Sequence, residues 1–155
     1  MGFWLLLVLQ WLHVLFAITW FGSTLATNFL IIPAAALLPA GEQAGWWKAF
    51  AARSTGYFAP VASATIIFGI ARGIAAGVLS VLTTTYGLTW IAALVLAIAL
   101  AAWGARGTGP TTARIATSTS SDHAVNVAAA NRVGRIELGG FLVIFTLMIA
   151  MHFGY

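Results

Sequence analysis

The sequence predicts an all-α integral membrane protein, a four-helix bundle with both termini on the non-cytoplasmic side. Three observations predict it. Of the 155 residues, 61% are hydrophobic and only 6% are charged, and the mean hydropathy is +0.99. A water-soluble domain of this length could not bury so much apolar surface. The apolar residues also fall into four runs of spanning length, and the cations gather in the loops on one side of them.

The first span is expected over about residues 3–32, an apolar run that ends near Pro33. No positively charged segment precedes it, and it exceeds the apolar core of a signal peptide, so we expect it to be retained as a helix. Between residues 42 and 53, charged side chains accompany three aromatic ones, Trp46, Trp47 and Phe50. This mixture predicts a short interfacial segment with its rings among the lipid headgroups.

The second span, about residues 57–79, carries a glycine at every fourth position near its end, at Gly69, Gly73 and Gly77. Such a stripe lets another helix backbone approach closely. It therefore predicts contact with a second helix, in a homo-oligomer or in a larger membrane complex. The third span is expected over about residues 88–104, after a short uncharged connection.

The polar segment from residue 106 to residue 122 is rich in Thr, Ser and Gly and is expected to form an exposed loop. Either Ser121 or Asp122 is suited to cap a helix that begins near His123. That helix is expected to continue into the fourth span, about residues 138–153. Nothing is left over for a soluble domain, so residues 1–155 are expected to form a single transmembrane domain.

Charge predicts the orientation. The two loops on one side, residues 33–56 and 105–137, hold all the Lys and Arg residues except Arg72, which falls within a span. The other loop and both termini hold none. By the positive-inside rule, the charged loops are cytoplasmic and the protein is a multi-pass protein of the cell's inner (plasma) membrane. A charge this sparse gives no sign of nucleic-acid binding, so the lipid bilayer is the expected partner.

The first span carries the residues that point to a function. Steps of three and four place Gln10, His13 and Trp20 on one face of a helix that is otherwise apolar. An ionisable group in a membrane helix is costly and usually faces a protein interior, a ligand or a water-filled cavity. His13 is therefore the first candidate ligand.

Further polar and soft side chains are expected in the same outer half of the bundle: Arg72, Tyr86, Trp90, Met148 and His152. A pocket between helices is a usual place for a bundle to bind a cofactor. Imidazole is a common haem ligand, aromatic rings suit a porphyrin, and an arginine pairs with propionates. Copper is the alternative, because it takes imidazole and thioether groups such as those of His13, His152 and Met148.

Structural roles account for the same residues. His13 is equally suited to a hydrogen bond between helices, His152 to a place in the interface, and Arg72 to reaching the lipid phosphates. Met148 fits simple packing. Glu137, close in sequence to Arg132 and Arg135, is expected to form an interfacial ion pair.

The stretch from His13 to Gly22, with Trp20 seven residues after the histidine, resembles the first helix of a group of small bacterial membrane proteins. That group includes the HemJ-type protoporphyrinogen oxidases and the membrane domain of CopD-type copper resistance proteins. The approach to the last span, from Arg132 to Glu137, is also similar to the CopD-type ending. The resemblance implies a four-helix fold with His13 as a haem b ligand. HemJ-type proteins carry a lysine about one turn after a tryptophan in helix three, whereas here Trp90 is followed by residues 91–94, Ile-Ala-Ala-Leu.

Three functions follow from these observations. The first is a haem b-binding membrane protein with a redox or electron-transfer role, the second a copper-binding or copper-transport protein, and the third a non-catalytic subunit that packs on a partner. The chain has no cysteine and only three acidic residues, and it shows no Ser-His-Asp, paired-carboxylate or phosphate-loop pattern. Whether the protein is an enzyme is left open.

Overall fold

The computed structural model describes residues 2–118 and 122–154, and this part of the chain is helical apart from short turns. The helices are α1 (Phe3–Ala26), α2 (Ile32–Ala35), α3 (Ala40–Ala75), α4 (Thr85–Trp103), α5 (Gly109–Thr117) and α6 (His123–His152). Two π-helical turns, η1 (Thr27–Ile31) and η3 (Gly104–Thr108), join α1 to α2 and α4 to α5, and a 3-10 turn, η2 (Val78–Ser80), follows α3. The prediction of an all-α bundle is confirmed.

Four continuous helical segments in the described residues are long and apolar enough to cross a membrane: Phe3–Ala35, Gly41–Ala75, Thr85–Thr117 and His123–His152. Their outer surfaces carry large apolar side chains, among them Trp11, Ile67 and Leu142, each at least 60% exposed. Such a surface suits lipid rather than water. The chain is therefore a multi-pass membrane bundle.

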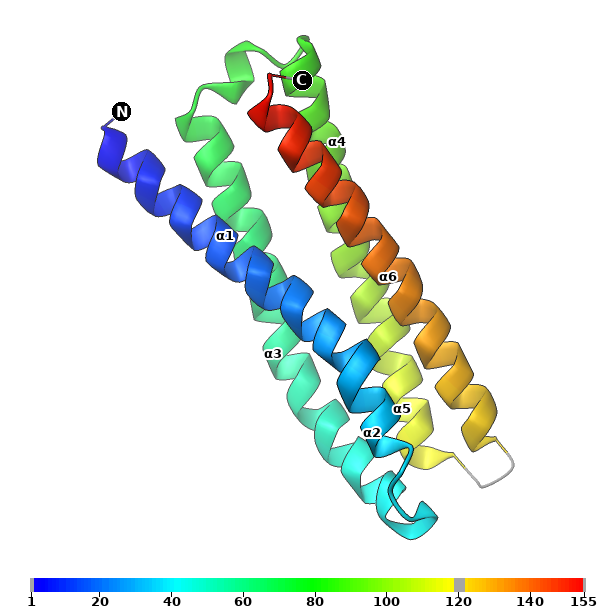
Figure 1. Cartoon of the computed structure of the whole chain (residues 1–155). Coiled ribbons are helices and arrows are strands. Elements are labelled where there is room, and N and C mark those ends of the chain that lie inside the picture. Colours follow the sequence, from blue (N-terminus) through cyan, green and yellow to red (C-terminus); the bar gives the residue numbers. More distant parts are fainter. Residues whose placement is uncertain (1, 119–121, 155) are drawn as a thin grey trace.

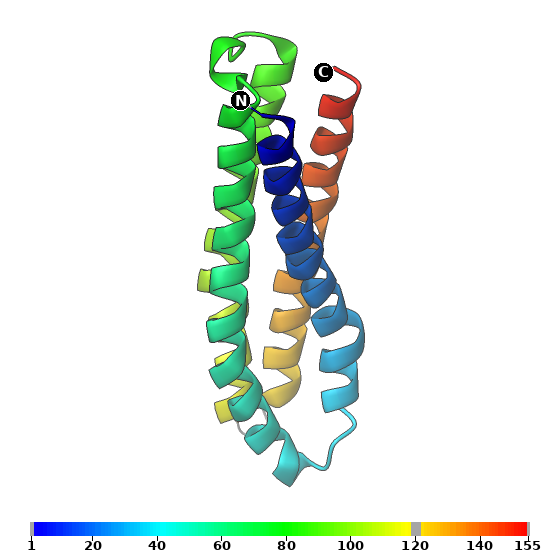
Figure 2. The same cartoon turned by 90° about the vertical axis from the view of Figure 1, so that its left-hand side faces the viewer.

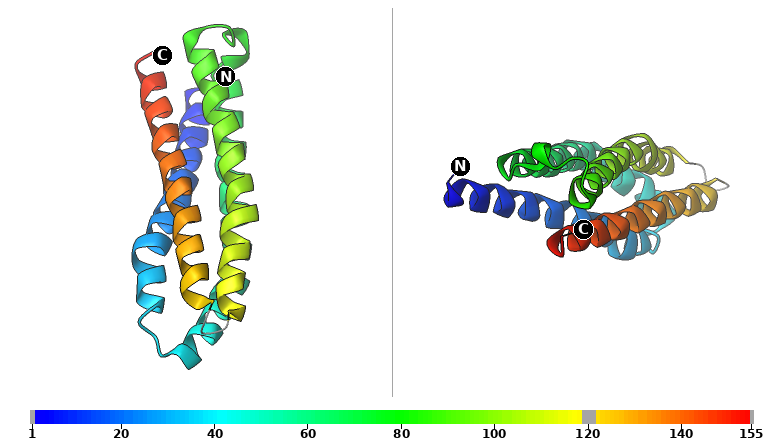
Figure 3. Two further views of the ribbon diagram at one scale, coloured as in Figure 1. Left: turned by 90° about the vertical axis from the view of Figure 1, so that its right-hand side faces the viewer. Right: turned by 90° about the horizontal axis from the view of Figure 1, so that it is seen from above.

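The four segments stand side by side with both termini at one end, which we call the terminal end (Figure 1). The opposite end, where α2 turns into α3, is the loop end. Helix α1 packs along α3, α3 packs on α4 and α5, and α6 packs on α4 and α5 and more loosely on α1. Figures 2 and 3 show the same order from the two sides and from above. Towards its N-terminus, α1 splays away from α6 (Figure 1).

The helices run further than the predicted spans, mainly at the loop end. The expected loop 33–56 is mostly helix, because α3 begins at Ala40, and much of the expected loop 105–137 belongs to η3, α5 and α6. Of the two residues expected to cap α6, Asp122 occupies the N-cap position, and Ser121 lies outside the described residues. Each segment thus continues well past the stretch that hydropathy alone defines.

A second apolar core explains these extensions. Trp47 is 1% exposed and packs with Ile32, Ala35, Ile115 and Ala130, so α2, α3, α5 and α6 meet around its ring. The indole of Trp46 stacks on Phe50 with ring centroids 5.3 Å apart. These aromatic residues were expected at the lipid headgroups. Trp47 is buried in this core with Trp46 and Phe50 half-buried beside it, and this burial favours helix where polarity predicted loop. The place of Trp46 and Phe50 among the headgroups stays a prediction.

The two π turns lie on either side of one stretch of α6. A π turn inserts one extra residue in a helix and is frequently found at functional sites. In η1, the Asn28 side chain covers Gly134 of α6, where a Cβ atom would overlap its amide, and its Nδ2 donates to the Thr24 carbonyl at 2.8 Å. In η3, Thr108 reaches Glu137 of the same helix. The turns therefore bring polar side chains to a common level inside the bundle.

The connection between α3 and α4 lies across the terminal end. Helix α3 ends at Ala75, and Gly77 has φ +85°, a left-handed conformation that glycine adopts without strain. Thr84 caps α4 by accepting a hydrogen bond from the Gly87 backbone N–H. The connection then packs directly on Gly87, because a Cβ atom there would overlap the Val81 carbonyl oxygen and lie 2.5 Å from Leu82 Cα.

Replacing Gly87 with alanine is expected to lower the free energy of unfolding by about 1–3 kcal/mol, because the new methyl group meets backbone atoms that cannot rotate away. Denaturant titration of the protein in micelles measures this change. Gly139→Ala is the matched control, since nothing lies within 4 Å of a Cβ atom at that position. Equal stabilities of the two variants would contradict the packing described for the connection.

Candidate functional site

A cavity of about 490 Å³ lies between α1, α3, α4 and α6 in the terminal half of the bundle. Its lining includes every residue that the sequence nominated for ligand binding: Gln10, His13, Trp20, Arg72, Tyr86, Trp90, Met148 and His152. All four membrane-spanning segments contribute to it. The volume falls within the range of about 300–1,000 Å³ that small-molecule and cofactor pockets occupy.

The His13 ring is held at the cavity wall by α3. Its Nδ1 lies 2.9 Å from the Thr65 carbonyl oxygen. Since a carbonyl can only accept a hydrogen bond, Nδ1 carries the proton and Nε2 keeps the lone pair of the neutral imidazole. Metal-ligating histidines are commonly oriented by such a bond from the other ring nitrogen. The ring is therefore fixed in the tautomer that a ligand role for Nε2 requires.

Two glycines of α3 provide the space for the rings of the site. A Cβ atom on Gly69 would lie 2.8 Å from His13 Cε1, and one on Gly73 would lie 2.6 Å from Trp90 Nε1. At these two positions the glycine stripe receives side chains of α1 and α4 of the same chain rather than a helix backbone, and contact with a partner chain stays a prediction. Gly77, the third member, ends α3 instead.

Arg72 contributes the positive charge of the cavity. The side chain is half-buried, and its Nε is fully buried with no hydrogen-bond partner within residues 2–118 and 122–154. A buried donor without an acceptor is costly, and a guanidinium group forms its strongest bonds with carboxylates and phosphates. An acidic group on a ligand in this cavity would supply the missing acceptor.

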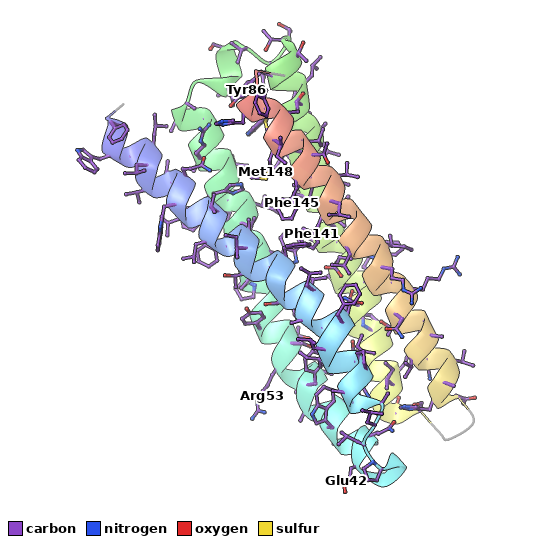
Figure 4. The ribbon with its side chains drawn as sticks, viewed as in Figure 1. Glu42, Arg53, Tyr86, Phe141, Phe145 and Met148 are labelled. Carbon is purple, nitrogen blue, oxygen red and sulfur yellow. The ribbon has the colours of Figure 1, made fainter. Side chains whose placement is uncertain are left out.

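Aromatic residues close the inner end of the cavity. Trp20 and Phe141 are each 3% exposed, and their rings meet edge to face with centroids 4.9 Å apart. Phe145 and Met148 follow Phe141 on the same face of α6, and all three point into the space beside α1 and α3 (Figure 4). The cavity is therefore apolar along its length, with its polar groups confined to a few positions.

The opening of the cavity lies at the terminal end. His152 lines it but is exposed, and its ring packs edge-on against Phe153 with centroids 5.6 Å apart. Gln10 and Tyr86 are half-buried in the lining, and Tyr86 lies beside the end of α6 (Figure 4). His152 thus belongs to the same site as His13, but it sits at the mouth rather than in the wall.

Glu137 differs from its prediction. It is 4% exposed, and its carboxylate accepts a 3.0 Å hydrogen bond from the Thr108 hydroxyl. The Trp20 indole lies within reach of the same carboxylate. Arg132 and Arg135, its expected partners, point outward and are exposed. The interfacial ion pair is therefore replaced by a buried carboxylate that bonds to neutral donors directly below the cavity.

Comparison with protein-family models, curated proteins and solved structures gave no match. The site must therefore be interpreted from its own residues. Within residues 2–118 and 122–154, no group of three or more His, Cys, Asp or Glu side chains is placed to hold a metal ion. A bare metal would need the thioether of Met148, whereas a macrocycle that supplies its own nitrogen atoms would need only one or two protein ligands.

Sequence reasoning missed several contributors to the site. Thr65 acts through its carbonyl oxygen, which any residue would offer, so the sequence holds no signal for it. The spacing of Gly69 and Gly73 indicated close packing, but it did not reveal that side chains rather than a helix backbone would fill the space. Phe141 is one of many apolar residues in its span. Glu137 carried a usable signal, an acidic residue at the border of a predicted span.

Proposed function

We propose that the protein binds haem b in the terminal-half cavity and serves in electron transfer. The observation that carries this proposal is the His13 ring, which lines the cavity and donates from Nδ1 to the Thr65 carbonyl. This bond leaves Nε2 with the lone pair that an iron ligand needs. A structural role in joining α1 to α3 would use the same hydrogen bond, but it would not require a cavity beside it.

Three further features suit this occupant. The aromatic floor of Trp20 and Phe141, together with Trp90, suits the faces and edges of a porphyrin. The unpartnered Nε of Arg72 suits a propionate. The placement of one imidazole in a wide apolar space fits a cofactor that brings four of its own metal ligands. His152, at the mouth, is proposed as a second ligand.

Bound haem would supply one-electron chemistry at its iron. The residues of the chain would do the rest. His13 would fix the position of the group, Arg72 would neutralise its acidic side chains, and the aromatic floor would keep water from the inner end. Copper held by His13, His152 and Met148 remains the second candidate, favoured by the Met148 thioether in the lining.

The orientation is proposed together with the function. Lys48, Arg53, Arg106, Arg114, Arg132 and Arg135 are all exposed on the half of the bundle towards the loop end. By the positive-inside rule this end faces the cytoplasm of a plasma membrane, and the cavity opens on the opposite side. A redox partner would then approach the site from outside the cell or from the periplasm.

The visible absorption spectrum of the purified protein tests the proposal, together with iron and copper analysis. Haem b gives an intense Soret band and iron in proportion to the protein. Copper without a Soret band would favour the second candidate. Neither metal, after expression in cells that make haem, would overturn both and leave a non-catalytic membrane subunit as the remaining interpretation.

A further inference from the structure

Packing alone does not explain why the Glu137 carboxyl group is buried among neutral side chains. Glu137 is one of only three acidic residues in the chain and is 4% exposed, midway along α6. Burial of an ionised carboxylate away from water is costly unless a positive charge accompanies it. Here it accepts a hydrogen bond from the neutral Thr108 hydroxyl, and the neutral Trp20 indole lies within reach. A group that takes up and releases a proton can occupy such a place in its neutral form.

The elements packed around Glu137 bring no charge to it. Helices α1, α4 and α5 and the turns η1 and η3 all contact α6. The charged or titratable residues of these elements and of α6 are His13 and His152 at the cavity, Tyr86 at the terminal end, His123 bonded to Ser118, and the exposed Arg106, Arg114, Arg132 and Arg135. None of these residues is paired with Glu137. Protonation of the carboxylate would therefore be what neutralises its negative charge.

The local backbone leaves room beside the carboxylate. A Cβ atom on Gly104 would lie 3.4 Å from Glu137 Oε1, so the first residue of the π turn η3 presents only backbone there. Thr108 binds the other oxygen, and Thr111 and Thr112 continue a row of hydroxyls from η3 into α5. Hydroxyl groups both donate and accept hydrogen bonds. Three threonine hydroxyls therefore follow Glu137 towards the loop end, the first bonded to the carboxylate and the other two to backbone carbonyls.

Trp20 connects the carboxylate with the cavity. Its indole lies within reach of the Glu137 carboxylate, while its ring lines the cavity and meets Phe141, one turn after Glu137 on α6. Anything that moves this indole changes the hydrogen bonding of the carboxylate. We propose that Glu137 is a proton-binding site inside the membrane and that Trp20 couples its protonation to the cavity. This proposal does not depend on which cofactor, if any, occupies the cavity.

Infrared difference spectroscopy of the full chain, in bilayers, tests the first half of the proposal. When the pH is stepped over a wide range, the carbonyl band of a protonated carboxylic acid should appear at low pH and disappear at high pH. This band should be absent in Glu137→Gln and present in Glu42→Gln, which removes an exposed acid. A band that persists in Glu137→Gln, or no titrating band in the wild-type protein, would overturn the proposal.

Thr108→Val provides a second variant in case Glu137→Gln does not fold. It removes one donor and keeps the carboxyl group, so the titrating band should remain with its midpoint moved. The coupling is tested by Trp20→Phe. Loss of the indole donor makes proton uptake easier, and the midpoint should move to higher pH by about one unit.

Trp11→Phe is the matched control for Trp20→Phe, since Trp11 lies on the same helix and is 63% exposed. It should leave the midpoint unchanged. Equal midpoints in Trp20→Phe and the wild-type protein would overturn the coupling to the cavity. Because the readout is the carboxyl band itself, failure here is separate from failure to find haem.

Discussion

The proposed haem site predicts that replacing His13 with alanine abolishes the Soret band entirely, although the protein still inserts in the membrane. The imidazole is held at the cavity wall by a hydrogen bond to another helix, the one to the Thr65 carbonyl. Its removal takes away both the proposed ligand and the hydrogen bond to Thr65 that orients it. The space over Gly69 that the ring vacates should then admit free imidazole. Added imidazole is therefore expected to restore part of the band.

Two further variants separate the effect of losing His13 from the effects of losing another histidine or the cavity arginine. His123→Ala removes a histidine that lies outside the cavity lining and bonds to Ser118, so its spectrum should match that of the wild-type protein. Arg72→Gln should keep the shape of the spectrum but bind haem about 10- to 100-fold more weakly, the effect of losing a hydrogen bond to a charged group. An unchanged Soret band in His13→Ala would remove His13 from the site.

Truncation of Phe141 to alanine is expected to produce the largest loss of stability, about 3–5 kcal/mol in the free energy of unfolding. Its ring packs against those of Trp20, Phe21 and Phe145. The side chain therefore joins α6 to α1 at the inner end of the cavity. Without it, a void opens beside Trp20, and the rings that remain lose their contacts. Unfolding in mixed micelles, followed by circular dichroism, measures the change.

Leu142→Ala is the control for this measurement. The neighbouring side chain is 60% exposed on the outer face of the same helix, where lipid replaces the lost contacts. It should lower stability by well under half of the Phe141 effect. Similar losses in the two variants would mean that the aromatic cluster does not hold the bundle together.

Much of the fold could be predicted because hydropathy and charge report on the bilayer directly. A run of about 20 apolar residues has few stable alternatives to a spanning helix. The meeting of polar groups from all four spans could also be predicted, because exposing the side chains of His13 and Arg72 to lipid is costly. Their depths followed from the helical rise alone, and the cavity lies where those depths coincide.

The loop end was not predictable in the same way. Trp47 is buried because α2, α5 and α6 happen to meet around it, and an identical Trp-Trp pair in the interface would look the same in sequence. The π turns η1 and η3 leave no composition signal that separates them from α-helix. Glu137 was assigned to its sequence neighbours Arg132 and Arg135, yet its partners lie on other helices. Such contacts between distant segments are set by packing, not by local pattern.

The glycines at 69 and 73 have a consequence for redesign of the bundle. The His13 ring on α1 and the Trp90 ring on α4 each lie against a glycine of α3, Gly69 and Gly73 respectively, so each ring and its glycine form a matched pair. A histidine moved by one turn along α1 would no longer lie against Gly69. Any attempt to raise or lower the ligand must therefore relocate the glycine on α3 along with it.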